Sequence, residues 1–314
     1  MNRVLKIGIL ADEVVGLEVV KFLANAFPNH IQCIFLTENS NIHKNILHLN
    51  LFNHIIYSSA TLYDDSTIKL LKTMQLDYIV LAWWPNIIKK SVIAIPKIGV
   101  LNFHPSYLPY NRGKHYNFWT LVEETPFGVT IHFVDEGIDT GDIVFQKKIE
   151  KIWEDTGETL YYKAQKTMIK LFIENYPQLI NNTYQRIPQN LNEGTFHLAS
   201  EIDTSSEIIL DKLYSGKHLL NLFRARQFPP HPSCYFFYND LKYNISIKIF
   251  KCIENDHNEI RQIFFINKQY KAKNLLLNGI NNKVVHKKVL YFIDNNILYS
   301  ANITISCAGI ENKL

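Results

Sequence analysis

The chain has 314 residues, of which 47% are hydrophobic and 20% are charged, and its formal net charge is +4 at pH 7. Its length suits one large domain or two ordinary ones, because single cores stop growing at roughly 250–300 residues. The apolar content excludes a disordered, collagen-like or coiled-coil chain. The small net charge argues against a protein that binds many nucleic-acid phosphates, so we expect no nucleic-acid partner.

The sequence contains no obvious targeting, membrane or disulfide signal. No stretch approaches the ~18 uninterrupted apolar residues that a membrane-spanning helix needs, and the apolar residues 4–11 run directly into two acidic residues, unlike a signal peptide. We expect a soluble, cytoplasmic protein with no membrane partner. The cysteines show no CxxC pair and no histidine at ligand spacing, which predicts neither a disulfide framework nor a zinc site. They are scattered along the chain at Cys33, Cys234, Cys252 and Cys307.

Strand-like and helix-like apolar patterns alternate through the first 150 residues. Buried strands are expected at 5–10, 31–36, 78–82 and 100–103, with helical patterns at 14–23 and 68–74 between them. Two further β-rich runs, at 128–134 and 142–149, would close the edge of the sheet. This order predicts an α/β, Rossmann-like fold whose mostly parallel sheet has helices on both faces and binds ligands at the carboxyl ends of its strands.

The second half of the chain has a different character. Asp155 and Glu158 are expected to cap a helix that Pro177 ends, and the Asn- and Gln-rich stretch that follows is typical of a linker. A helix at 216–226 and alternating apolar strands as far as Cys307 predict a smaller β-rich domain. The expected division is a catalytic domain at 1–183, a linker at 184–200 and a C-terminal domain at 201–314.

The first segment with chemical content is 101–109, Leu-Asn-Phe-His-Pro-Ser-Tyr-Leu-Pro, at the end of a predicted buried strand. In extended backbone, Asn102 and His104 point to one face while Phe103 points into the core. An amide and an imidazole are therefore expected side by side at the ligand-binding edge of the sheet. An isolated Asn-x-His pair more often just satisfies loop backbone, because such pairs are common by accident.

The second segment, 134–142, places carboxylates between Gly137 and Gly141, in a loop whose backbone can approach a ligand closely. Alone it is only a turn. Together with Asn102 and His104 it completes a set of amide, imidazole and carboxylate, which is what acyl transfer to an amine requires. The amine must lose a proton, the carbonyl oxygen becomes an oxyanion, and the imidazole must be held in a useful tautomer.

These motifs, in this order, resemble the core of the formyltransferases that use 10-formyltetrahydrofolate. The match covers residues 78–150 closely and the rest of the first domain loosely. It implies that Asn102 donates to the oxyanion, that His104 accepts the amine proton or stabilises the tetrahedral intermediate, and that Asp139 orients His104 or relays the proton. The matching residues are Asn102-x-His104-Pro105-Ser106-x-Leu108-Pro109-x-x-Arg112-Gly113, then Gly128-Val129-Thr130, then Asp135-x-Gly137-Ile138-Asp139-Thr140-Gly141-Asp142.

The resemblance also implies N10-formyltetrahydrofolate as co-substrate, with its pterin between the loops 84–88 and 134–140. A pteridine needs backbone donors and acceptors beneath an apolar cover, and both loops offer these. The residues implied to contact the folate are Trp84, Asn86, Ile88, Val134, Gly137 and Thr140.

The residues around Arg112-Gly113 indicate the acceptor within this family. Transfer-RNA formyltransferases typically continue with small residues and Pro, whereas residues 114–119 here are Lys-His-Tyr-Asn-Phe-Trp, similar to enzymes that formylate an amino sugar on a nucleotide diphosphate. The resemblance implies that Arg112 and Lys114 meet the diphosphate, Asn111 the sugar or nucleotide, and that Arg224 reaches the site. The ordinary alternatives are solvated loop charges for Arg112 and Lys114 and a helix-dipole role for Arg224.

The resemblance therefore implies a sugar N-formyltransferase that acts on a dTDP-linked 3- or 4-amino-dideoxyhexose in O-antigen or other surface-polysaccharide (lipopolysaccharide) biosynthesis. Asp12 and Glu13 would repel a phosphate at the first helix, which argues against glycinamide ribonucleotide as acceptor. Exposed strand edges in the second domain allow a homodimer. Methionyl-tRNA formyltransferase is the alternative, favoured by a net charge of +5 in residues 184–314 against −1 in residues 1–183. A non-catalytic folate-binding or interaction protein is the other class, and the intact trio argues against it.

Overall fold

The structure is a computed structural model that describes residues 3–37, 42–47, 55–252, 263–278 and 285–308. The chain divides into two compact units. The first comprises Met1–Gly113, Pro126–Ile149 and Tyr162–Phe196, and the second comprises Lys114–Thr125, Glu150–Tyr161 and His197–Leu314. This division differs from the predicted boundaries, because the chain enters the second unit twice before residue 197. The segment expected to be a linker belongs to the first unit as far as Phe196.

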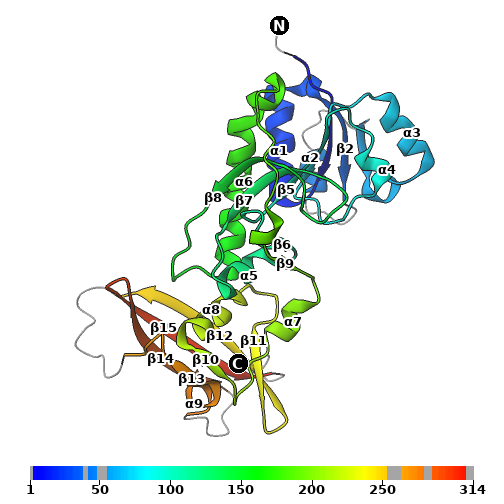
Figure 1. Cartoon of the computed structure of the whole chain (residues 1–314). Coiled ribbons are helices and arrows are strands. Elements are labelled where there is room, and N and C mark those ends of the chain that lie inside the picture. Colours follow the sequence, from blue (N-terminus) through cyan, green and yellow to red (C-terminus); the bar gives the residue numbers. More distant parts are fainter. Residues whose placement is uncertain (1–2, 38–41, 48–54, 253–262, 279–284, 309–314) are drawn as a thin grey trace. The chain divides into compact units, whose positions relative to one another are not determined.

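The first unit is built around a seven-stranded sheet of order β3-β2-β1-β4-β5-β7-β8 (Figure 1). The first five strands in this order run parallel, whereas β5 with β7 and β7 with β8 are antiparallel. The predicted mostly parallel α/β sheet with two later strands at its edge is confirmed. The strands are β1 (Ile7–Ala11), β2 (Ile31–Leu36), β3 (Ile56–Ser58), β4 (Tyr78–Ala82), β5 (Gly99–His104), β7 (Gly128–Phe133) and β8 (Ile143–Lys148).

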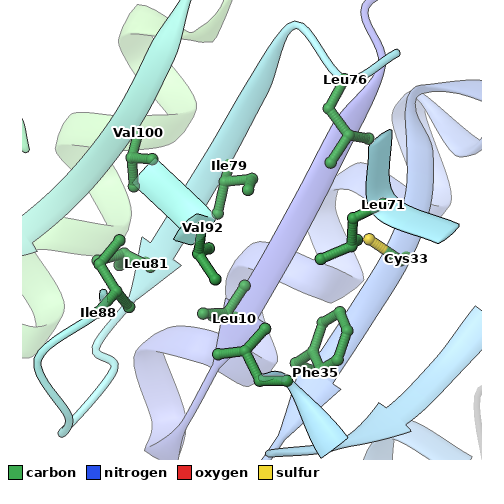
Figure 2. Close-up of a cluster of buried hydrophobic side chains, with 11 residues drawn as sticks. Leu10, Cys33, Phe35, Leu71, Leu76, Ile79, Leu81, Ile88, Val92 and Val100 are labelled. Carbon is green, nitrogen blue, oxygen red and sulfur yellow. The ribbon is translucent and has the colours of Figure 1, made fainter. Parts of the chain in front are cut away.

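Helices and short turns complete the first unit. On one face of the sheet, a cluster of buried side chains joins the strands to Leu71 and Val92 (Figure 2). On the other face, Phe103 packs against Phe172, with ring centroids 5.1 Å apart. Phe103 therefore points into the core, away from its neighbours Asn102 and His104, as strand alternation predicts. The elements are α1 (Glu13–Ala26), η1 (Pro28–His30), α2 (His43–Leu47), η3 (Ser59–Thr61), α3 (Asp65–Thr73), α4 (Lys90–Ile93) and η4 (Leu191–Glu193), together with the part of α6 (Gly157–Asn181) that follows Tyr161.

Two predictions about α6 are wrong. The helix continues through Pro177 to Asn181. Pro177 and the residue four positions before it are both exposed, so water can bond the carbonyl group that proline leaves without a partner. The apolar residues beyond Pro177, Leu179 and Ile180, are buried and hold the last turn in place. At the other end, Thr156 caps the helix instead of Asp155, because the Thr156 hydroxyl accepts the backbone N–H of Thr159 at 3.2 Å.

The second unit is rich in antiparallel strands, as predicted. Its main sheet has the order β11-β12-β15-β14, and β10 pairs with β13. Asn239 and Asp240, which join β11 to β12, have φ of 49° and 60°, the backbone that a two-residue hairpin turn of type I′ requires. The elements are α5 (Tyr116–Val122), α7 (Glu201–Ser205), β10 (Leu213–Ser215), α8 (Gly216–Ala225), β11 (Cys234–Tyr238), β12 (Leu241–Lys251), β13 (Gln269–Lys271), α9 (Ala272–Leu276), β14 (Val285–Asp294) and β15 (Ile297–Cys307). Two further strands of two residues each, β6 (Arg112–Gly113) and β9 (Phe196–His197), lie where the chain passes from one unit to the other.

Candidate active site

Three polar side chains meet where β5 ends, in the first unit. β5 supplies Asn102 and His104, and the loop between β7 and β8 supplies Asp139. Asn102 donates from Nδ2 to Asp139 Oδ1 at 3.2 Å, and His104 Nδ1 lies 3.4 Å from Asp139 Oδ2. The structure therefore brings together the three residues that the sequence motifs singled out.

His104 lies between two acceptors. Its Nδ1 faces the carboxylate of Asp139, and its Nε2 lies 3.2 Å from the backbone carbonyl oxygen of Asn111. A neutral imidazole can donate to only one of these groups, whereas an imidazolium donates to both. Because the ring is buried, its protonation state decides how many of these two contacts it can make.

The carboxylate of Asp139 is held in its ionised form. Burial raises the pKa of Asp139, but the charge of His104, the contacts with His132 and the backbone N–H of Gly113 together lower that pKa far below the ordinary value. The Gly113 N–H donates to Oδ2 at 2.9 Å. Asp139 is therefore a fixed negative charge beside His104 throughout the neutral pH range.

His132 is a member of the site that the sequence reasoning missed. The antiparallel register of β5 and β7 places it directly opposite Asn102. Its Nδ1 donates to the carbonyl oxygen of Phe133 at 2.7 Å, while its Nε2 lies 3.2 Å from Asn102 Nδ2 and 3.5 Å from Asp139 Oδ1. The Nε2 either accepts from Asn102 in the neutral ring or donates to Asp139 in the protonated ring. Only the pairing of the two strands could have revealed this residue.

The loop that carries Asp139 has a constrained backbone. Asp139 itself has φ of 54°, in the left-handed region. Asp135 Oδ1 accepts from the N–H of Gly137 at 3.0 Å and from the hydroxyl of Thr140 at 2.6 Å. A Cβ on Gly137 would overlap the Thr140 side chain, and one on Gly141 would overlap the Phe133 carbonyl group. The glycines in this motif therefore serve the shape of the loop.

The predicted folate residues divide into buried and exposed groups. Ile88 belongs to the buried cluster shown in Figure 2, and Trp84 and Val134, one from each predicted pterin loop, pack against the same cluster. The indole Nε1 of Trp84 is buried and has no hydrogen-bond partner among the residues described. Asn86 is exposed. An apolar surface and one unpaired buried donor fit the edge of a pterin.

The candidate acceptor-binding residues of the first unit have different surroundings. Asn111 is fully buried, with its Oδ1 accepting from the Thr195 hydroxyl at 3.1 Å, so its side chain shapes the loop and its carbonyl group faces His104. This position does not support the predicted sugar contact. Arg112 is half-buried, its guanidinium lies 5.8 Å from the Phe196 ring, and its Nε is buried with no partner in the part of the chain that is described. Arg112 thus has one buried donor that is not paired among these residues.

The two candidates in the second unit differ as well. Lys114 is exposed. Arg224 is buried, and its Nη1 donates to the carbonyl oxygens of Ile152 and Trp153 at 2.7 and 3.1 Å. Burial lowers the pKa of Arg224 to about 10, so it stays charged at neutral pH. These bonds tie Arg224 to backbone within its own unit, and they do not support the predicted substrate contact.

Neither a metal centre nor a membrane helix is found within the described ranges. No group of three or more His, Cys, Asp or Glu side chains there is arranged to hold a metal ion. No helix among these residues is both long and apolar enough to cross a bilayer.

Comparison with known protein families agrees with this geometry. Residues 28–175 match the family described as formyl transferase, and residues 201–251 match the N-formyltransferase dimerization C-terminal domain. The two matches together include more than half of the chain. The protein belongs to the formyltransferase family. The family predicted from the sequence motifs is therefore confirmed.

Individual relatives differ in the acceptor that their names state. Methionyl-tRNA formyltransferase of Thermodesulfovibrio yellowstonii is 32% identical over 183 residues, 58% of each chain. The alignments span only 46–58% of the length of the first three curated relatives, all of that name. Among solved structures, the sugar 3N-formyl transferase WlaRD has a TM-score of 0.64, 19% identity and 99% coverage of both chains. The N-formyltransferase of Helicobacter canadensis has a TM-score of 0.63, 18% identity, and coverage of 96% of this chain and 99% of its own. These structures establish the fold.

Proposed function

We propose that this formyltransferase moves a formyl group from N10-formyltetrahydrofolate to the amine of a dTDP-linked 3- or 4-amino-dideoxyhexose, in the cytoplasmic synthesis of O-antigen or another surface polysaccharide. The observation that carries the proposal is the likeness over nearly the whole chain to the sugar 3N-formyl transferase WlaRD, which covers 99% of both chains. The sequence at 112–119 supports it. So do the ligands of two solved relatives, which are dTDP with 5-N-formyl-THF in one and folinic acid with dTDP-3-aminofucose in the other.

The trio supplies the chemistry that amide formation needs. As the amine attacks, negative charge develops on the formyl oxygen, and N–H groups placed near that oxygen stabilise it. His104 can take the proton that the attacking amine loses, and Asp139 balances the positive charge that the ring then carries. Both N–H groups of Asn102 face Asp139 and His132, so one of them must turn toward the oxygen during the reaction. The proton then passes from the His104 ring to N10 of the folate, as the bond between the formyl carbon and N10 breaks.

In this proposal the pterin is held by the residues whose surroundings fit it. Trp84 offers the unpaired Nε1–H, and Ile88 and Val134 offer apolar cover. The folate supplies the formyl group when it is bound. Lys90, which follows the first predicted pterin loop, forms an ion pair of 2.6 Å at the surface with Glu136, which lies within the second. This pair marks the outer rim of the proposed site.

The proposed assembly is a homodimer formed through the second unit, and the name of the matching domain supports it. Large apolar side chains on β12 and β14 are about half exposed, namely Phe250, Val289 and Ile293. The cross-strand register through β15 places Phe250 and Val289 on one face of the sheet. A second copy of this chain would cover that face.

The acceptor is tested by the release of tetrahydrofolate from N10-formyltetrahydrofolate. We expect release to depend on a dTDP-linked amino sugar, because the reaction requires a neutral amine bound next to the formyl group. The panel contains dTDP-3-amino and dTDP-4-amino sugars, dTDP alone, and methionyl-tRNA. Faster release with methionyl-tRNA than with every amino sugar would favour the second candidate function, which the names of eight curated relatives support.

Binding of the diphosphate is expected to depend on Arg112 and Lys114. Loss of one charge-assisted hydrogen bond costs on the order of 1.5–3 kcal/mol, so Arg112→Ala or Lys114→Ala should weaken dTDP binding about 10-fold or more. The measurement is calorimetric titration of each variant with dTDP. Lys147→Ala, which removes an exposed lysine of β8, is the control and should bind like wild type. Unchanged affinity in both test variants would make these residues ordinary surface charges.

A further inference from the structure

Residues 186–189 run along the catalytic loop of the first unit, although the sequence suggested a linker there. Ile187 exchanges two backbone hydrogen bonds with Ile143, of 2.8 and 2.9 Å. Arg186 Nε donates to Asp142 Oδ2 at 3.1 Å. The segment is thus fastened at the point where the loop enters β8.

Gln189 makes a different kind of contact. Its Nε2 donates to the carbonyl oxygen of Asp139 at 3.0 Å and to that of Gly141 at 2.7 Å. Both N–H groups of one side-chain amide therefore bind backbone on either side of Thr140. Because the left-handed conformation is unfavourable for a residue with a Cβ, Asp139 adopts it only where neighbouring groups hold the chain.

The Oδ2 atom of Asp139 must meet two groups from other segments, the His104 ring and the Gly113 N–H. The side chain of aspartate is short, so the backbone of Asp139 determines where its carboxylate lies. The Gln189 amide is hydrogen-bonded to the carbonyl oxygen of Asp139 itself. We propose that Gln189 is a positioning residue: its amide fixes the backbone of the 139–141 turn and so aims the Asp139 carboxylate at His104. The proposal rests on the proposed formyl transfer for its catalytic consequence.

The proposal is tested with two variants of similar size. Gln189→Met keeps the length of the side chain but removes both donors, and Gln189→Glu places a carboxylate oxygen against two carbonyl oxygens. We expect kcat to fall about 10-fold in the first variant and further in the second, with the KM for the amino sugar unchanged within about twofold. The pKa of Asp139 is held low by the contacts with His104, His132 and the Gly113 N–H. The pKa of Asp139 should rise when its carboxylate moves away from these groups. The fall of kcat on the acid side of its pH profile should therefore begin at a higher pH than in wild type.

The matched control is Arg186→Gln, which removes a tie of the same segment but leaves the Gln189 amide in place. It should keep kcat within about twofold and the wild-type pH profile. A second readout is hydrogen exchange of peptides covering 135–142 in the protein without acceptor, which should speed up in Gln189→Met and stay unchanged in Arg186→Gln.

The experiments distinguish a failure of the proposed function from a failure of the positioning role of Gln189. If the wild type formylates no amino sugar, the proposed function is wrong, and hydrogen exchange together with kcat on the acceptor it does use decides the role of Gln189. Wild-type kcat and pH profile in both Gln189 variants, or losses equal to those of Arg186→Gln, would overturn the positioning role. Faster exchange with unchanged kcat would also overturn it.

Discussion

Replacing Asp139 with Asn is expected to lower kcat by about 10³-fold or more, with little change in the affinity for folate or nucleotide. The amide keeps the size of the side chain but removes the charge that stabilises the His104 imidazolium and fixes its orientation. Loss of a buried aspartate in the equivalent relation to a catalytic histidine costs ~10⁴-fold in serine proteases. The measurement is single-turnover formation of the formylated sugar, with ligand affinities determined separately.

The pH for comparing Asp139→Asn with wild type follows from the direction in which the pKa of Asp139 is shifted. The pKa of Asp139 in the folded protein lies below that of an unfolded aspartate, about 3.9. Its contribution to stability is therefore fully present above roughly pH 4 and is lost as the pH falls through the folded pKa. Between pH 6 and 8 the wild-type carboxylate stays ionised, so the difference between wild type and variant should hardly change with the titration of Asp139.

The control for this variant is Asp77→Asn. Asp77 is also buried, and its carboxylate accepts hydrogen bonds from Arg3 and from the backbone N–H of Lys6, at the opposite end of the sheet strands from the site. It should lose stability and keep kcat within about twofold. A residual kcat above about a tenth of wild type in Asp139→Asn would contradict the role assigned to Asp139.

Replacing His104 with Asn is expected to lower kcat by at least about 10²-fold, the usual effect of losing general acid–base help. The His104 ring lies between the Asp139 carboxylate and the Asn111 carbonyl oxygen, and the shorter side chain of Asn can donate to only one of these two acceptors. The loss should appear in kcat, since His104 is placed to act on the developing charge and not to hold the substrate. Steady-state kinetics with saturating folate and amino sugar measures it.

The double variant of His104 and Asp139 shows whether the two residues work as one unit. If Asp139 acts through His104, changing both should cost little more than the larger single loss. Losses that multiply would mean that the two residues contribute independently, and the mechanism derived from their contact would be wrong.

The sequence predicts the sheet well for a physical reason. Residues 31–36 and 78–82 form strands at the predicted bounds, because continuous apolar runs of that length suit strands that are buried on both faces. Helix α6 passes through Pro177 because buried residues beyond the proline outweigh its local effect. The short helix α5 is not among the predicted elements, because its residues Phe118 and Trp119 stand in a motif that suggests a substrate-binding loop, whereas both side chains are buried.

The site is predictable only in part. Asn102, His104 and Asp139 stand in spaced motifs, and their chemistry can be inferred from residue types. His132 and Gln189 reach the site through strand register and through the path of a segment with no motif of its own. The sequence alone does not show whether Asn111 and Arg224 can contact a substrate. That depends on whether the side chain is buried and on which nearby groups it is hydrogen-bonded to, and both are properties of the folded chain.

The central claim is that the amine of a nucleotide-linked sugar receives the formyl group. The most direct measurement gives the enzyme a limiting amount of N10-formyltetrahydrofolate labelled with ¹³C in the formyl group, together with equal concentrations of methionyl-tRNA and the best dTDP-linked amino sugar. Mass spectrometry then follows the label in both products. Nearly all of the label should appear as an N-formyl group on the sugar nucleotide, and label found mainly on methionyl-tRNA would contradict the proposed function.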